Sequence, residues 1–111
     1  MLRRGFIGGF ELLVLSALIR LGDDAYGVPI AEAIAVSSGR EVAQGSVYIT
    51  LERLSQKGFV TSRIGEPTAE RGGRAKTYFR ITAKGLREVR RARQTLLSLW
   101  DGIPQLQRGS T

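Results

Sequence analysis

Apolar residues near the N-terminus recur with the period of a helix. One stripe consists of Phe10, Leu13, Val14, Ala17, Leu18 and Leu21. Its spacing predicts a helix that packs one face against a core and ends at Gly22. A second stripe, on the other side of the same helix, consists of Leu12, Leu15 and Ile19. A helix that is apolar nearly all round must be covered all round, and we expect a second subunit to provide the missing cover.

A second helix is predicted directly after a polar turn. The turn of residues 22–27 has the sequence GDDAYG and offers Asp23 and Asp24 as caps for the helix that follows. Pro29 suits the first turn of that helix, where a missing N–H costs nothing. The apolar face is formed by Ile30, Ala31, Ile34 and Ala35.

A third helix and a β-hairpin follow. Ser46 is placed to cap the helix and Gly58 to end it. The residues predicted to face the core are Val47, Leu51 and Leu54. Residues 59–64 and 77–81 are β-rich, and the Gly- and Pro-containing segment 65–73 separates them. Two such runs around a loop predict a hairpin.

The last predicted element is a long helix that begins at Thr82. Its apolar residues Leu86, Val89, Ala92, Leu96 and Trp100 lie three, three, four and four positions apart. The order helix, helix, helix, hairpin, helix predicts a mainly α fold with a small β-hairpin, a winged helix-turn-helix with an added C-terminal helix. We assign residues 1–81 to the DNA-binding domain, 82–103 to a C-terminal dimerisation helix and 104–111 to a frayed tail.

The charge of the chain is unevenly distributed. The formal net charge is +7 over 111 residues, yet residues 1–44 carry a net charge of −1 while residues 61–81 carry +3 and residues 82–111 carry +4. This asymmetry favours a polyanionic partner, nucleic acid or an anionic membrane, and the alternative is a merely solvated basic surface.

The third helix has a polar face left over once its apolar side is assigned to the core. Ser46, Ile49, Thr50, Arg53 and Lys57 fall on that face. Hydroxyl groups and arginine suit base edges and phosphates, as the recognition helix of a helix-turn-helix requires. In the hairpin, Arg71, Arg74 and Lys76 are expected to lie against the DNA backbone.

The residue types that are missing narrow the possible functions. The chain has no histidine and no cysteine. Their absence excludes Ser-His catalytic triads, histidine as a general base near neutral pH, and zinc sites made of cysteine and histidine. We therefore expect no enzyme, no metal and no cofactor. The lack of cysteine and of a long apolar run favours a cytoplasmic protein with no membrane partner.

Three segments of the chain resemble a known family. They are FELLVLSALIRLGDDAYGVPIAEAI (10–34), GSVYITLERLSQKGFVTSR (45–63) and GEPTAERGGRAKTYFRITAKG (65–85). In combination they are similar to PadR-type transcriptional regulators, although Ile49 stands where many members have proline. The resemblance implies a homodimeric DNA-binding repressor that dimerises through its C-terminal helix. Carried over by position, the DNA-contacting candidates are Ser46, Tyr48, Thr50, Arg53 and Lys57, with Arg74 and Lys76 in the wing.

The expected dimer joins the two unsatisfied apolar stripes. The predicted interface consists of Leu12, Leu15, Ile19, Leu86, Val89, Leu96 and Trp100. A dimer predicts an inverted-repeat site on double-stranded DNA. The resemblance also allows a hydrophobic small-molecule effector between the subunits, with Trp100 as a stacking surface. A winged-helix adaptor that binds protein instead of DNA, and an anionic-membrane binder that uses the last helix, are the rival hypotheses.

Overall fold

The computed structural model describes residues 6–66 and 75–107. Their elements, in chain order, are α1 (Gly9–Leu21), the 3-10 turn η1 (Gly22–Asp24), α2 (Gly27–Ser38), α3 (Gln44–Gln56), β1 (Val60–Ile64), β2 (Thr77–Ile81), α4 (Ala83–Trp100) and the 3-10 turn η3 (Pro104–Leu106). The mainly helical fold with one hairpin is therefore confirmed. The last turn falls in the segment that we expected to be frayed.

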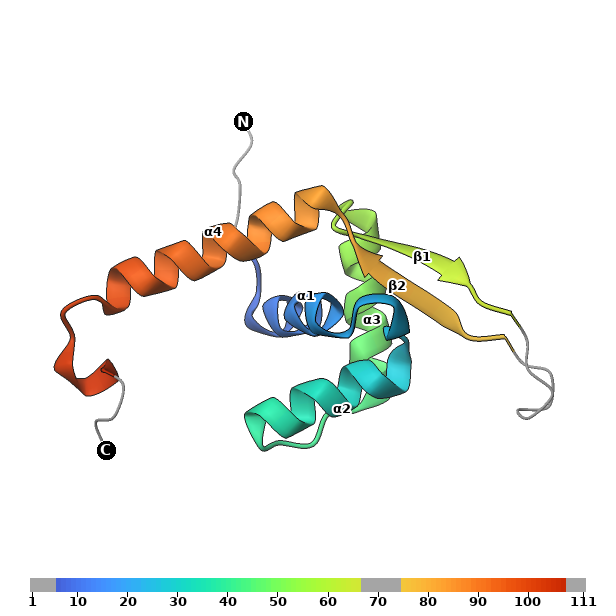
Figure 1. Cartoon of the computed structure of the whole chain (residues 1–111), viewed down its shortest axis with the longest axis horizontal. Helices are drawn as coiled ribbons and strands as arrows, with labels where there is room; N and C mark the ends of the chain where they lie inside the picture. Colours follow the sequence, from blue (N-terminus) through green and yellow to red (C-terminus); the bar gives the residue numbers. More distant parts are fainter. Residues whose placement is uncertain (1–5, 67–74, 108–111) are drawn as a thin grey trace.

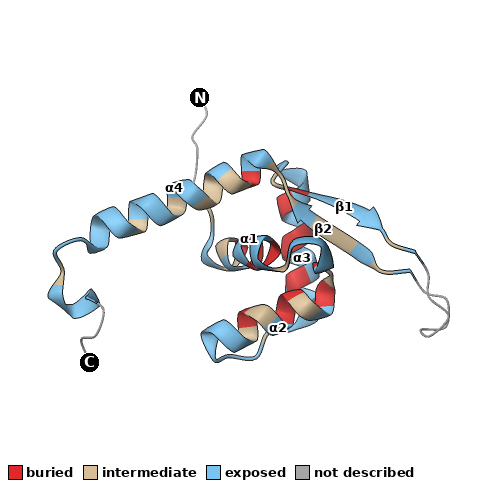
Figure 2. Ribbon diagram, viewed as in Figure 1, coloured by how far each residue is buried: buried red, intermediate tan, exposed pale blue. Residues whose placement is uncertain are grey.

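The core lies where α1, α2 and α3 meet. Figure 2 shows the buried residues gathered there and at the base of the hairpin, while most of α4 is exposed. The largest fully buried side chains are Leu15, Ile30, Leu51, Leu54, Val14 and Val47. With the smaller buried residues included, each helix contributes positions three or four apart: Val14 with Ala17 and Leu18, Ile30 with Ile34, and Val47 with Leu51 and Leu54. One face of each helix therefore meets the others.

The buried face of α1 is rotated from the predicted one. Leu15 is fully buried in the single chain, whereas Leu13 is 44% exposed. The buried positions are 11, 14, 15 and 18, with Ala17 beside them, and position 11 is a glutamate. The sequence pattern missed this face because a carboxylate was not counted as buried. The prediction of Leu15 as a dimer-interface residue is therefore wrong, since a partner cannot reach it.

Two helix starts also differ from the predictions. Among the described residues no side chain caps α2, and its N-cap is Tyr26. Asp23 instead forms an ion pair with Arg80 of the hairpin, with 2.7 Å between Oδ1 and Nη2. Helix α3 begins at Gln44 after Ala43, so Ser46 lies inside its first turn and does not cap it.

The hairpin is antiparallel and is attached to the core at its base. Val60 pairs with Ile81 at one end of the register and Ile64 with Thr77 at the other. The amide of Phe79 donates to the carbonyl of Ala25 at 2.8 Å, which fixes β2 beside the start of α2. From there the hairpin extends away from the helices (Figure 1).

The entry into α4 is a dense set of polar contacts. Thr82 is the N-cap, as predicted, and its hydroxyl accepts from the Gly85 amide at 3.0 Å and donates to the Gly58 carbonyl at 2.8 Å. Lys84 donates to the Lys57 carbonyl at the end of α3, at 3.1 Å. Gly58 follows the end of α3 with a φ of 81°, the left-handed conformation that glycine adopts most easily.

The C-terminal half of α4 extends beyond the other helices (Figure 1). The radius of gyration is 16.1 Å, whereas a compact chain of this length has about 13 Å. Among the large apolar residues of this half, Leu97, Leu99 and Trp100 are 43%, 65% and 45% exposed. A single chain therefore leaves this apolar surface in water.

Within residues 6–66 and 75–107, no helix is both long enough and apolar enough to cross a membrane. The same described residues contain no group of three or more acidic side chains that could hold a metal ion.

Candidate nucleic-acid interface

Helix α3 divides sharply into a buried and an exposed face. Val47, Thr50, Leu51 and Leu54 are buried. Ser46, Ile49 and Arg53 are exposed, with Ile49 60% accessible. Thr50 is only 5% exposed, so the prediction that it contacts DNA is wrong. Its position follows Val47 by three residues and precedes Leu54 by four, which places it on the core side of the helix.

Tyr48 sits at the edge between the two faces. Its ring packs against Phe79 of β2 in an edge-to-face arrangement, with 6.4 Å between centroids. A Cβ added at Gly27 would overlap the Tyr48 hydroxyl, so glycine at position 27 makes room for this side chain. Tyr48 is still 44% exposed, so its ring is only partly packed and part of the side chain remains accessible.

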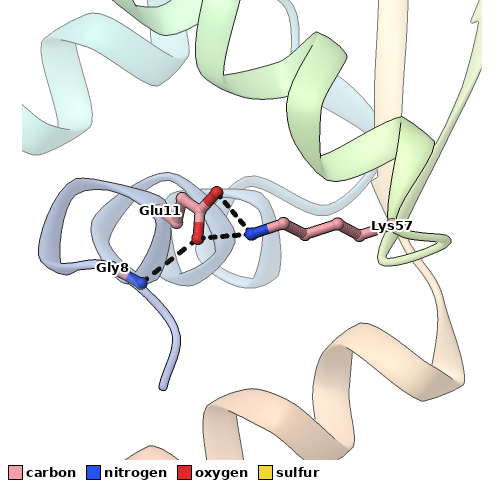
Figure 3. Close-up of polar contacts among 3 residues, drawn as sticks. All are labelled: Gly8, Glu11 and Lys57. Atoms are coloured by element: carbon pink, nitrogen blue, oxygen red, sulfur yellow. Dashed lines mark hydrogen bonds and ion pairs between the residues drawn. The ribbon is translucent and has the colours of Figure 1, made fainter. Parts of the chain in front are cut away.

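Lys57 forms an ion pair with Glu11 of α1. Its ammonium donates to both carboxylate oxygens of Glu11, at 3.1 and 2.9 Å, and the Gly8 amide donates to the same carboxylate at 3.2 Å (Figure 3). Burial alone would raise the pKa of Glu11. The hydrogen bonds from Lys57 and Gly8, with the charges of Lys57 and Arg53, together lower that pKa below its ordinary value of 4.5. The pair anchors the end of α3 to the start of α1.

This anchor predicts an acid-dependent stability. A carboxyl whose folded-state pKa is lowered contributes stability above its unfolded-state pKa, and the contribution is lost as the pH falls through the folded-state value. Glu11→Gln should lower the free energy of unfolding by about 1–2 kcal/mol at neutral pH. The difference from the wild type should shrink below about pH 4. Urea unfolding at several pH values tests this, with the exposed Glu32→Gln on α2 as the control. A pH-independent deficit in Glu11→Gln would contradict it.

The wing contributes cations of two kinds. Arg80 is neutralised by Asp23, whereas Arg63 and Lys76 lie over aromatic rings, Arg63 over Tyr78 at 4.6 Å and Lys76 over Tyr26 at 4.2 Å. Of the predicted wing residues, Lys76 is therefore described, while Arg71 and Arg74 lie outside the described residues. Arg63 was not predicted as a candidate.

The predicted interface residues lie on two sides of α1 and along α4. Leu12 helps to line a pocket of about 440 Å³ between the start of α1 and α4, together with Leu96 and Leu99. Ile19 lines a groove of about 590 Å³ between α1 and α2. Val89 packs partly against the chain's own core, and Leu86 is half-buried. Trp100 is accessible near the end of α4.

Sequence reasoning missed three residues that shape this site. Glu11 was assigned no role because an acid inside an apolar stripe gives no sign of its partner. Gly27 was missed because the side chain that it makes room for, Tyr48, lies in another helix. Arg63 was read only as part of a strand.

Three helices, a recognition-type α3 and a projecting hairpin define a winged helix-turn-helix protein. Residues 14–91 match the model of the transcriptional regulator PadR-like family. The chain belongs to that family, whose members are transcriptional regulators and not enzymes.

Solved structures agree with this assignment. A transcriptional regulator from Clostridium thermocellum is 25% identical, with a TM-score of 0.68 over 88% of this chain and 92% of that one. A PadR family transcriptional regulator from Eggerthella lenta is 24% identical, with a TM-score of 0.67 over 91% of this chain and 83% of that one. A PadR-like regulator from Bacillus cereus, 20% identical, reaches a TM-score of 0.70 over 91% of this chain and 93% of that one. The last two support the fold alone. A comparison with curated proteins finds no match.

Proposed function

We propose that the chain is a homodimeric, cytoplasmic repressor that binds an inverted repeat in duplex DNA. The observation that carries the proposal is the division of α3 into a buried apolar face and an exposed face with Ser46, Ile49 and Arg53. A helix held in this way presents side chains to the major groove while its other face is fixed by the core. We propose repression rather than activation because the family resemblance implies a repressor.

The exposed residues of α3 have chemistry that suits base edges. Arg53 can donate two parallel hydrogen bonds to guanine, and the Ser46 hydroxyl can donate to or accept from either partner of a base pair. Ile49 offers an apolar surface for a thymine methyl group. With Thr50 buried, these three residues replace the predicted set as base readers, and Tyr48 is a candidate for a phosphate contact. Lys57 contributes less, because Glu11 already balances its charge.

The exposed end of α4 supports a second copy as the partner. Leu99 and Trp100 are large, apolar and accessible, and α4, the helix that carries them, extends past the other helices (Figure 1). Burying a few hundred Å² of such surface at about 25 cal/mol per Å² favours association by several kcal/mol before the entropy of association is counted. The pocket beside Leu12 and Leu96 lies along the same helix and would give a hydrophobic effector room at the interface.

Selection of bound duplexes from a random library tests the proposal as a whole. We expect enrichment of a palindromic site with half-sites about one helical turn, roughly 34 Å, apart. Enriched sites without two-fold symmetry would contradict the dimer. A lack of any enrichment would contradict DNA binding and favour the protein-interaction adaptor. Preferential binding to anionic vesicles would favour the membrane hypothesis. Lower expression of a reporter downstream of the site would test repression.

Arg53→Ala should relax sequence preference. Losing a bidentate contact to guanine should cost about 1–3 kcal/mol on the preferred site and little on random duplexes. Arg93→Ala, on the exposed side of α4, is the matched control and should change both affinities equally, if at all. Titrations against the selected site and a scrambled duplex measure the ratio. Equal losses on both duplexes for Arg53→Ala would show that this residue contacts phosphate and not base.

A further inference from the structure

Four residues at the wing form a continuous arrangement of cation, ring, ring and cation. Lys76 lies 4.2 Å from the centroid of the Tyr26 ring. That ring meets the Tyr78 ring edge to face, with 5.3 Å between centroids. Arg63 lies over the Tyr78 ring, 4.6 Å from its centroid. Tyr26 comes from the start of α2, while the other three residues lie on or beside the strands of the hairpin.

The backbone holds this arrangement in place. Arg63 and Tyr78 are direct partners in the antiparallel register. The Gly65 amide donates to the Lys76 carbonyl at 2.7 Å. A Cβ at Gly65 would overlap the Tyr78 ring, so glycine there lets the ring lie close to the strand. The bond from the Phe79 amide to the Ala25 carbonyl keeps the neighbouring Tyr26 against β2.

Lys76 and Arg63 are held by aromatic rings, whereas the nearby cations are held by carboxylates. The charge of Lys57 is balanced by Glu11, and that of Arg80 by Asp23. Within residues 6–66 and 75–107, neither Arg63 nor Lys76 forms an ion pair with a carboxylate. An aromatic face attracts a cation without neutralising it, and an ammonium over a ring keeps donors that can point elsewhere. The two rings therefore restrict the positions of the two cations, and no carboxylate of the described residues offsets their charge toward a polyanion.

We propose that Tyr26 and Tyr78 are positioning residues that hold Lys76 and Arg63 for contact with the phosphates of duplex DNA. The inference rests on the proposed DNA-binding function and assigns to it a wing contact that α2 helps to orient. Because Tyr26 is the N-cap of α2 and not part of the hairpin, the rings would also fix the angle at which the wing leaves the helices.

A double-mutant cycle between Tyr26 and Lys76 tests the proposal. Binding of full-length protein to a random-sequence duplex is measured at several salt concentrations for Tyr26→Leu, Tyr26→Phe, Lys76→Gln and the double variant Tyr26→Leu with Lys76→Gln. The affinity falls as salt rises, and Lys76→Gln should make this fall shallower, reducing the magnitude of the slope of log affinity against log salt by about 0.9. Tyr26→Leu should weaken binding about two- to five-fold, the size of an exposed cation–π contact. Tyr26→Phe keeps the ring and should bind like the wild type.

The cycle separates positioning from folding. In the Lys76→Gln background, Tyr26→Leu should cause no further loss if the ring acts through the lysine. Equal losses in both backgrounds, or a loss in Tyr26→Phe as large as in Tyr26→Leu, would overturn the proposal. The corresponding cycle of Tyr78→Leu with Arg63→Gln gives an independent answer if Tyr26→Leu does not fold. An unchanged salt slope in Lys76→Gln, while the wild type binds DNA, would refute the wing contact and leave the proposed function standing. A wild type that binds no duplex would refute both.

Discussion

Replacing Leu99 and Trp100 together with glutamate should convert the protein to a monomer and reduce its affinity for the selected site by a factor of about 10²–10⁴. The size of the loss follows from linked binding, because two joined recognition helices bind two half-sites far more tightly than one helix binds one. Both residues are accessible in the single chain, so the substitutions should leave the fold of the subunit intact. Light scattering gives the mass, and titration against one half-site and against the full repeat gives the affinities.

The matched control for this pair is Ser98→Glu. Ser98 lies two positions from both Leu96 and Trp100, so it faces the opposite side of α4. Ser98→Glu adds a negative charge to the same turn of α4 without changing the apolar side that carries Leu96 and Trp100. We expect it to stay dimeric and to retain binding to the full repeat. A dimeric, tightly binding Leu99→Glu, Trp100→Glu variant would place the subunit interface elsewhere. A monomer whose affinity for a single half-site is also lost would indicate a damaged fold.

The elements of this fold were predictable because each follows from local chemistry. Gly22 and Gly58 end helices with positive φ values of 62° and 81°, and both had been assigned to helix ends. Thr82 caps α4 with its own hydroxyl, an interaction between residues three apart. The order of the elements then determined the winged helix-turn-helix class, because few arrangements of three helices and a hairpin share one core.

The rotated face of α1 and the buried Thr50 were not predictable for a different reason. In both cases a polar side chain lies on a buried face. Glu11 is buried because Lys57, 46 positions away, satisfies its carboxylate. Thr50 lies at helical spacing from Val47 and Leu54, but its hydroxyl marked it as polar, and only the packing of α3 against the core shows that this edge of the helix is buried. Hydrophobic periodicity assigns such residues to the surface, since it contains no information on tertiary contacts.

The candidate site was predictable at the level of elements and only partly at the level of residues. Ser46, Arg53 and Lys76 are accessible or half-accessible where the pattern placed them, but their DNA contacts are still predictions. Whether a cation is paired with a carboxylate, as Lys57 is, or lies over a ring, as Lys76 does, depends on distances across the fold. Spacing along a sequence cannot distinguish these two environments, although they change how much charge reaches a phosphate.

Gly85 should tolerate substitution poorly. It is buried in the first turn of α4, and a Cβ there would overlap the carbonyl oxygen of Phe59 and the side chain of Ile81. The Phe59 carbonyl cannot move freely, because it also accepts from the Thr82 amide at 2.9 Å. A glycine inside a helix normally destabilises it by about 1 kcal/mol relative to alanine, so Gly→Ala at an ordinary helical position stabilises. At Gly85 we expect the opposite sign.

Gly85→Ala should lower the free energy of unfolding by about 1–3 kcal/mol, the usual cost of overpacking a filled site. For a domain of this size, that corresponds to a fall in Tm on the order of 5–20 °C. Gly45→Ala is the matched control, since Gly45 is in the first turn of α3 and a Cβ added there meets nothing within 4 Å. It should melt at or slightly above the wild-type temperature. Thermal melts followed by circular dichroism compare the three proteins. A Gly85→Ala protein as stable as the Gly45→Ala control would mean that α4 can move away from Phe59 at no cost. In that case the Thr82, Lys84 and Gly85 contacts would not fix the direction of the helix that carries the proposed dimer interface.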